Sequence, residues 1–235
     1  MIPLKDDLPS RTAPVMTVSI ITLNVLVFLY YVSLQLGISL EVDNPPHAAE
    51  TAQQFILEFG LVPCRLMGLC RFPEDQPAPL FTVFSSMFLH GSFFHIGGNM
   101  LYLWIFGDNV EDWFGRIPYL VFYLLCGVAA TFAQLAFSMG STIPSLGASG
   151  AIAGVLGAYI LLFPGERITV LFDYGGVGRV PANIVIGLWF VLQLFSGFGS
   201  VAATADTGGV AYMAHVGGFV AGLVITFILG GRRQD

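Results

Sequence analysis

Three short segments of this sequence combine chemically reactive side chains with apolar surroundings. HGSFFHIGGN contains His90, His95 and Asn99, GASG contains Ser149, and AYMAHVGG contains His215. A serine hydroxyl becomes a nucleophile when a neutral imidazole accepts its proton, and nearby N–H donors can stabilise the oxyanion that then forms. These residue types favour acyl-transfer chemistry, provided that the fold brings the three segments together.

The spacing within the first segment argues against a metal site. His95 and Asn99 are four residues apart and share one helix face, whereas His90 and His95 are about 140° apart around a helix. A zinc protease of the common helical type needs two histidines four residues apart with a glutamate between them. We therefore expect no metal and no other cofactor. The alternative is that these side chains only form hydrogen bonds between helices.

Small residues accompany both Ser149 and His215. Stripes of this kind let two helices approach closely, so the GASG segment could serve packing alone. If the two stripes meet, however, Ser149 Oγ and His215 Nε2 come within hydrogen-bond distance. The small residues are Gly147, Gly150, Gly154, Gly157 and Ala158 in one segment and Ala211, Ala214, Gly218, Ala221 and Gly222 in the other.

The composition indicates which elements must position these residues. Of the 235 residues 55% are hydrophobic and only 10% are charged, whereas a soluble domain carries about 25% charged residues. The mean hydropathy is +0.78. A helix needs about 20 apolar residues to cross a bilayer. We predict an all-α, polytopic membrane protein with six transmembrane helices, at 15–38, 93–106, 117–137, 145–163, 181–199 and 209–229.

The basic residues predict the orientation. With the N-terminus in the cytoplasm, seven of the nine Lys and Arg residues are cytoplasmic, and only Arg65 and Arg71 lie outside. We expect both termini in the cytoplasm and a prokaryotic plasma membrane as the location. The expected organisation is a short cytoplasmic lead (1–14), a membrane domain (15–230) with a long outer loop at about 39–92, and a cytoplasmic tail (231–235).

This topology brings the reactive residues to one depth. His95, Asn99, Ser149 and His215 all lie in the first third of the second, fourth and sixth spans, which begin at the outer face. No acidic side chain lies at this depth, because Asp108, Glu111 and Asp112 belong to the cytoplasmic end and Asp206 to a loop. We predict a Ser149–His215 dyad. His95, Asn99 and the Ser149 N–H at a helix N-terminus would stabilise the oxyanion.

The motifs H-x4-H-x3-N, G-x-S-G and A-H-x-x-G, in this order, resemble those of the rhomboid family of intramembrane serine proteases. The resemblance covers about residues 80–230. It implies a rhomboid-like bundle whose water-accessible cavity opens to the outer face and whose substrates are transmembrane segments of other proteins. The roles it implies are Ser149 as nucleophile, His215 as base, His95 and Asn99 for the oxyanion, His90 for loop structure and bound water, and Gly150 and Gly218 for close helix packing.

Two positions depart from the family pattern. Many members carry a Trp-Arg pair in the first loop, where this chain has Phe81 and Thr82. Many also carry an aromatic residue four positions after the serine, against which the catalytic histidine rests, and here that position is Ala153. We expect another ring, such as that of Tyr212, to support His215.

The cysteines leave two possibilities open. Cys64 and Cys70 lie in the expected outer loop, where an oxidising compartment permits a disulfide, but two free thiols fit equally well. Cys126 lies within the third expected span as a packing residue.

The main functional alternative is a non-catalytic rhomboid-like protein that binds transmembrane clients. A channel or transporter is disfavoured because the spans lack acidic residues for ion coupling and the chain shows no inverted repeat. Nucleic acid is excluded as a partner because basic patches are absent.

Overall fold

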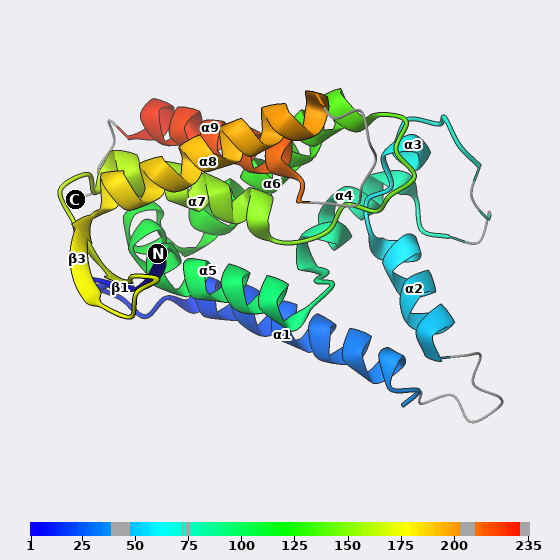
Figure 1. Cartoon of the computed structure of the whole chain (residues 1–235), viewed down its shortest axis with the longest axis horizontal. Helices are drawn as coiled ribbons and strands as arrows, with labels where there is room; N and C mark the ends of the chain where they lie inside the picture. The colour runs from blue at the N-terminus through cyan, green and yellow to red at the C-terminus, as the bar shows by residue number, and fades with distance from the viewer. Residues whose placement is uncertain (39–47, 72, 74–75, 203–209, 231–235) are drawn as a thin grey trace.

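The computed structural model describes residues 1–38, 48–71, 73, 76–202 and 210–230, and these are mostly helical. Figure 1 shows a small sheet at one end of the long axis and the helices α2 to α4 at the other. The elements are β1 (Ile2–Asp6), α1 (Val15–Gln35), α2 (Ala48–Phe59), α3 (Pro63–Leu66), α4 (Pro79–Ser85), η1 (Ser86–Phe88), α5 (Phe93–Phe114), α6 (Arg116–Ser138), α7 (Ser149–Leu162), β2 (Arg167–Leu171), β3 (Val177–Pro181), α8 (Ala182–Ala202) and α9 (Tyr212–Leu229).

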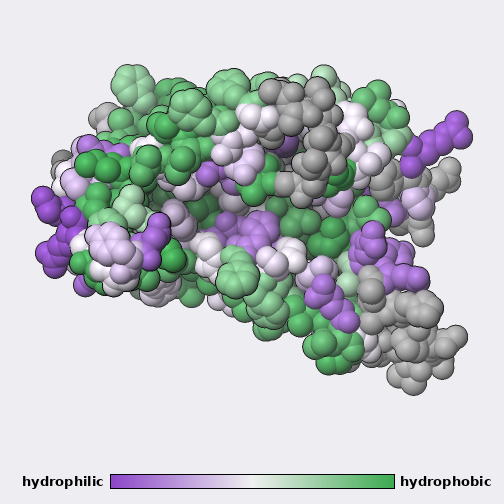
Figure 2. All heavy atoms as spheres, in the orientation of Figure 1, coloured by the Kyte–Doolittle hydropathy of each residue, from purple (hydrophilic) through white to green (hydrophobic). Residues whose placement is uncertain are grey.

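The helices have the lengths and apolar character of a polytopic membrane protein. Among the described residues, α1, α6, α8 and α9 are each long and apolar enough to cross a bilayer, and α4–η1 with α5 form a fifth candidate that is bent by 80°. On the face that Figure 2 shows, hydrophilic residues gather at the two ends of the long axis and in a smaller patch near the middle, and much of the remaining surface is hydrophobic. The expected spans at 15–38, 117–137 and 181–199 correspond to α1, α6 and α8 within three residues at each end.

The other three expected spans have different limits. α5 continues eight residues beyond the predicted end at 106, to Phe114, and α9 begins at Tyr212. The predicted start of the fourth span at residue 145 is wrong, because α7 begins only at Ser149. Residues 141, 145 and 147 instead form backbone hydrogen bonds with residues 61, 64 and 86, and Gly147 has a φ of 122°, which a right-handed helix cannot contain.

A three-stranded sheet corrects the expectation of an all-α protein. The strand β2 lies between β1 and β3, antiparallel to both, with Pro3 opposite Val170 and Thr169 opposite Arg179. Ile168 and Val170 of β2 are fully buried, which is the alternation of a half-buried strand. The protein is therefore mostly helical but not all-α, and β1 lies within the expected lead at 1–14.

The helix α7 forms the centre of the bundle. It packs against α5, α6, α8 and α9, and every residue from Gly150 to Tyr159 is buried. Its apolar character on all sides matches this surrounded position. The N-terminal end of α7 is the end nearer α4 (Figure 1), and Ser149 is its first residue.

The expected outer loop at about 39–92 contains α2, α3, α4 and η1. Residues 39–47, 72 and 74–75 of this loop lie outside the described residues, as do the expected tail at 231–235 and the start of the sixth expected span at 209.

Candidate active site

Ser149 and His215 contact each other although 66 residues separate them. The serine is the first residue of α7, the histidine lies in the first turn of α9, and Ser149 Oγ is 2.8 Å from His215 Nε2. His215 is buried, with 8% of its surface exposed. A serine hydroxyl at this distance can pass its proton to a neutral imidazole.

The opposite nitrogen of His215 is also bonded. Its Nδ1 lies 2.7 Å from Oε1 of Gln193, a residue of α8. Because an amide oxygen only accepts hydrogen bonds, Nδ1 must carry the proton. Nε2 is then unprotonated and accepts the hydrogen bond that Ser149 Oγ donates.

An aromatic ring also lies beside His215, and it belongs to Trp189 rather than to Tyr212. The ring centroids of Trp189 and His215 are 5.9 Å apart and their planes make an angle of 34°. Trp189 lies one helical turn before Gln193, so both side chains project from one face of α8. The expected ring support thus comes from α8, whereas Ala153 is fully buried inside α7.

Neither Gln193 nor Trp189 was among the candidate residues from the sequence. The available signal was a glutamine in an otherwise apolar segment, four residues after a tryptophan. A neutral amide carries no charge, so it does not stand out as an acidic third member of a serine–histidine site would.

Glycines allow the serine and histidine helices to approach closely. A Cβ on Gly218 would lie 1.9 Å from the carbonyl oxygen of Gly150, and one on Gly222 would lie 2.0 Å from that of Gly154. Real Cβ atoms do not come so close to backbone oxygen, so glycine is required at this crossing. Gly150 directly follows Ser149, and Gly218 lies three residues after His215, so this backbone contact is close to both side chains.

Residues between α1 and α5 hold the segment that leads into Ser149. Leu61 and Ser145 exchange two backbone hydrogen bonds, of 3.0 and 2.8 Å, and Gly147 N–H donates to Ser86 O of η1 at 2.9 Å. These contacts fix the extended backbone that α7 follows. Non-helical backbone at membrane depth must be buried in protein in this way.

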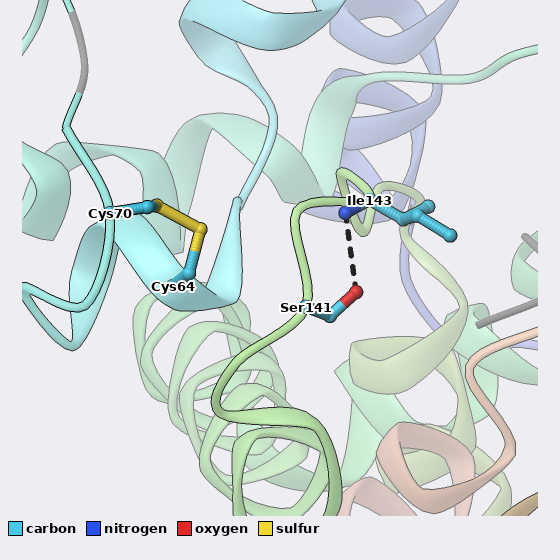
Figure 3. Close-up of a disulfide and its surroundings, with 4 residues drawn as sticks. All are labelled: Cys64, Cys70, Ser141 and Ile143. Carbon is cyan, nitrogen blue, oxygen red and sulfur yellow. Dashed lines mark hydrogen bonds between the residues drawn. A yellow bond between two sulfur atoms is a disulfide. The ribbon is translucent and has the colours of Figure 1, made fainter. Parts of the chain in front are cut away.

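A disulfide closes part of the same loop. Cys64 and Cys70 are bonded to each other, while Cys126 is a buried free thiol in α6. Cys64 N–H also donates to Ser141 O at 3.0 Å, and Ser141 Oγ accepts from Ile143 N–H at 3.2 Å (Figure 3). The disulfide therefore lies beside the segment that ends at Ser149.

His95 and Asn99 lie against Gly147, two residues before the serine. A Cβ on Gly147 would lie 2.7 Å from His95 Nε2 and 3.7 Å from Asn99 Nδ2. Asn99 Nδ2 also lies 2.8 Å from Nε2 of the buried His90, and the rings of His90 and His95 are 4.9 Å apart. The amide of Asn99 has two N–H groups, so one remains for another acceptor when the other bonds to His90.

The start of α7 offers further donors beside Ser149. The first N–H groups of a helix have no carbonyl partner within it, and the residue before α7 is Ala148, whose side chain provides no cap. A small cavity of about 30 Å³ adjoins Ser149, with Thr131 and Gln134 in its lining. This volume accommodates about one or two water molecules.

The positions of the missing Trp-Arg pair carry no comparable polar contact to the site. Phe81 is half exposed and lines an apolar groove between α1, α2 and α4, and Thr82 Oγ1 donates to Pro79 O at 2.6 Å. A buried arginine nevertheless joins parts of this loop, since Arg65 donates to the carbonyl oxygens of Glu58 and Pro77.

The arrangement contains the groups that acyl transfer needs. A serine hydroxyl, an imidazole with a hydrogen-bond partner at each nitrogen and several N–H groups lie together at the end of α7. Within the part of the chain that the structure describes, no group of three or more His, Cys, Asp or Glu side chains could hold a metal ion.

Comparison with known proteins places this geometry in a family. The model of the Rhomboid domain matches residues 77–232. Rhomboid protein 1, mitochondrial, of Saccharomyces cerevisiae is 31% identical over 155 residues, which are 64% of this chain and 42% of that protein. Rhomboid protease GluP of Bacillus subtilis is 32% identical over 142 residues, 60% of this chain and 24% of that protein. Human presenilin-associated rhomboid-like protein, mitochondrial, is 37% identical over 89 residues, 37% of this chain and 24% of that protein.

The matched region spans less than half the length of each of these relatives. Two of the three names are mitochondrial and one protein comes from a bacterium. The mitochondrial relatives conflict with the expectation of a prokaryotic plasma membrane, whereas a multi-pass membrane protein agrees with the fold and the family.

Proposed function

This chain belongs to the rhomboid family, and we propose that it is an intramembrane serine endopeptidase that cleaves transmembrane segments of other membrane proteins. The observation that carries the proposal is the 2.8 Å contact between Ser149 Oγ and His215 Nε2. A serine that served helix packing alone would not need a hydrogen bond to an imidazole. It would need still less an imidazole whose other nitrogen is also held by a hydrogen bond.

In the proposed mechanism Ser149 Oγ attacks the carbonyl carbon of the scissile peptide bond while its proton passes to His215 Nε2. The resulting oxyanion accepts hydrogen bonds from His95, Asn99 and N–H groups at the start of α7. His215 then donates the proton to the leaving amine, and the acyl group stays on Ser149. Water attacks this ester as His215 accepts its proton, and His215 returns that proton to Ser149 Oγ as the bond between the acyl carbon and Oγ breaks, which releases the acid and restores the serine. No cofactor takes part.

We further propose a six-span topology, with α7 as a short fourth span surrounded by the others and the α4–η1–α5 unit supplying the second. The serine end of α7 would face outward together with the loop at 39–92, and the termini would be cytoplasmic. The basic residues support this orientation. The disulfide between Cys64 and Cys70 supports it as well, because disulfides persist in oxidising compartments.

A Ser149→Ala variant tests the proposal. We expect it to fold like the wild type but to lose at least about a thousandfold in the cleavage rate of a reconstituted transmembrane reporter, because the nucleophile is absent. A fluorophosphonate probe should label the wild type and not the variant. Ser138→Ala is a matched control, since Ser138 Oγ donates to the carbonyl of Gln134 within its own helix α6.

Two results would contradict the proposal. Cleavage by Ser149→Ala at the wild-type rate would remove the serine from the mechanism. A wild type that is neither labelled nor active on several reporters, yet captures transmembrane segments, would favour a non-catalytic client-binding protein.

A further inference from the structure

We propose that Gln193 is a positioning residue that holds His215 in its reactive tautomer and orientation, in the place where soluble serine proteases use an acidic residue. The inference rests on the proposed function, because it assigns a role in the same site. Gln193 belongs to α8, a helix that supplies none of the motif residues.

The hydrogen-bond pattern supports this role. Gln193 Oε1 is 2.7 Å from His215 Nδ1, and Nε2 on the other side of the ring is 2.8 Å from Ser149 Oγ. With Oε1 as the acceptor, the proton must reside on Nδ1, which leaves the Nε2 lone pair directed at the serine. A reversed amide would donate to Nδ1, force the proton onto Nε2 and leave Ser149 without a base. The position of a single amide oxygen thus selects the productive state.

Packing restricts the ring further. His215 is buried, and Trp189, one turn before Gln193, lies against its face at 5.9 Å between ring centroids. The imidazole is thereby fixed at both nitrogens and against one face. Gln193 is itself partly buried on α8, which packs directly on α9. The amide therefore approaches the histidine from a helix in direct contact with it.

A neutral amide suits this location better than a carboxylate. When His215 accepts the serine proton it becomes an imidazolium, and Gln193 Oε1 continues to accept from Nδ1–H throughout the step. A permanently charged acid at membrane depth is costly to bury. Gln193 supplies the orientation that an acid provides without that charge, at the expense of weaker stabilisation of the imidazolium.

The test compares Gln193→Leu, which removes the acceptor, with Gln193→Glu, which retains an acceptor oxygen on a side chain of the same length. For Gln193→Leu we expect kcat to fall about 10- to 100-fold, with KM within about twofold of the wild type, because only proton transfer is impaired. Gln193→Glu should recover most of this loss. Gln35→Leu is the matched control, since Gln35 is exposed on α1 and its side-chain amide donates to Tyr31 Oη in the same helix.

A second measurement does not depend on activity. The chain contains four histidines, so the ¹⁵N resonances of labelled imidazoles in detergent can be assigned by substitution. We expect His215 to be protonated at Nδ1 in the wild type and in Gln35→Leu, and to populate both tautomers in Gln193→Leu. Thermal unfolding of each variant shows whether it is folded.

The outcomes separate the two proposals. If Gln193→Leu is folded and cleaves at the wild-type rate, or if wild-type His215 carries its proton on Nε2, the positioning role is wrong while the protease assignment stands. An inactive and unlabelled wild type overturns the protease assignment instead, even if the tautomer still depends on Gln193.

Discussion

The imidazole of His215 is held by three neighbours. Ser149 Oγ faces its Nε2, and Gln193 and Trp189 contact the ring from α8, a helix without motif residues. Position 153 is alanine and offers no ring to His215. The ring of Trp189 packs beside the histidine instead. Its effect should be on the orientation of the base rather than on the chemistry itself.

We therefore expect Trp189→Leu to lower kcat/KM of the reporter cleavage roughly two- to tenfold, in line with about 0.5–1.5 kcal/mol for an aromatic contact. Loss of ring packing lets the imidazole rotate away from the serine. The matched control is Trp104→Leu, because Trp104 is an exposed residue of α5. Equal activity of the two variants would show that the ring contact has no role in holding the base.

At the residue scale, sequence reasoning reached the motif residues and missed their neutral support. Ser149 and His215 belong to motifs whose order and depth indicated one site. Gln193 carries no charge and cannot titrate, so a search for a third ionisable residue could not find it. His95 and Asn99 were expected near the oxyanion, and their described contacts are with Gly147 and His90, beside the serine.

At the scale of elements, the crossing of α7 and α9 determines whether the serine and the base can meet. The carbonyl oxygens of Gly150 and Gly154 lie where Cβ atoms of Gly218 and Gly222 would stand. A backbone carbonyl cannot move aside as a flexible side chain can. The methyl group of an alanine at either glycine must therefore push the two helices apart. The separation would act directly on the 2.8 Å contact between Ser149 and His215.

Gly218→Ala should therefore both destabilise the protein and reduce its labelling by a fluorophosphonate. Overpacking costs about 1–3 kcal/mol, which corresponds to a fall of roughly 2–12 °C in the midpoint of thermal unfolding for a chain of this size. Gly187→Ala is the control, because a Cβ at this position of α8 would meet nothing within 4 Å. If the two variants unfolded at the same temperature, the close approach of α7 and α9 would not be a constraint.

Hydropathy was sufficient to locate the helices but not the start of α7. Apolar length depends on composition alone, so α1, α6 and α8 could be predicted within a few residues. The start of α7 is instead determined by backbone hydrogen bonds that Ser145 exchanges with Leu61 and that Gly147 N–H donates to Ser86 O, about 60 to 85 residues earlier in the chain. Those contacts place Ser149 at a helix N-terminus, and no local pattern around Ser145 reveals them.

At the scale of the whole molecule, the N-terminal strand links the sheet to the helix that carries the serine. Asp6 Oδ2 accepts hydrogen bonds from Tyr159 Oη of α7 at 2.8 Å and from Asn109 Nδ2 of α5 at 2.7 Å. Each strand has only five residues, and their pairing joins the two ends of a long sequence interval. Hydropathy windows average over such short segments, which is why the sheet was not predicted.

This link should make stability depend on pH. Burial raises the pKa of Asp6 to about 6, partly offset by the Tyr159 hydrogen bond and aided by the negative charge of Asp108. The folded chain therefore binds this proton more tightly than the unfolded chain does. The stabilisation is fully present below the unfolded value of 3.8 and is lost as the pH rises through about 6.

An Asp6→Asn variant isolates this contribution, because its amide oxygen can still accept from Tyr159 but cannot ionise. Between pH 5 and pH 7.5 the midpoint of thermal unfolding should fall more in the wild type than in the variant, by on the order of 2 °C after allowance for solvent screening of this half-buried group. Asp173→Asn is the control, since the Asp173 side chain is 91% exposed in the same region, and it should follow the wild type. If Asp6→Asn showed the same pH dependence as the wild type, ionisation of Asp6 would not affect how the N-terminal strand is held against α7.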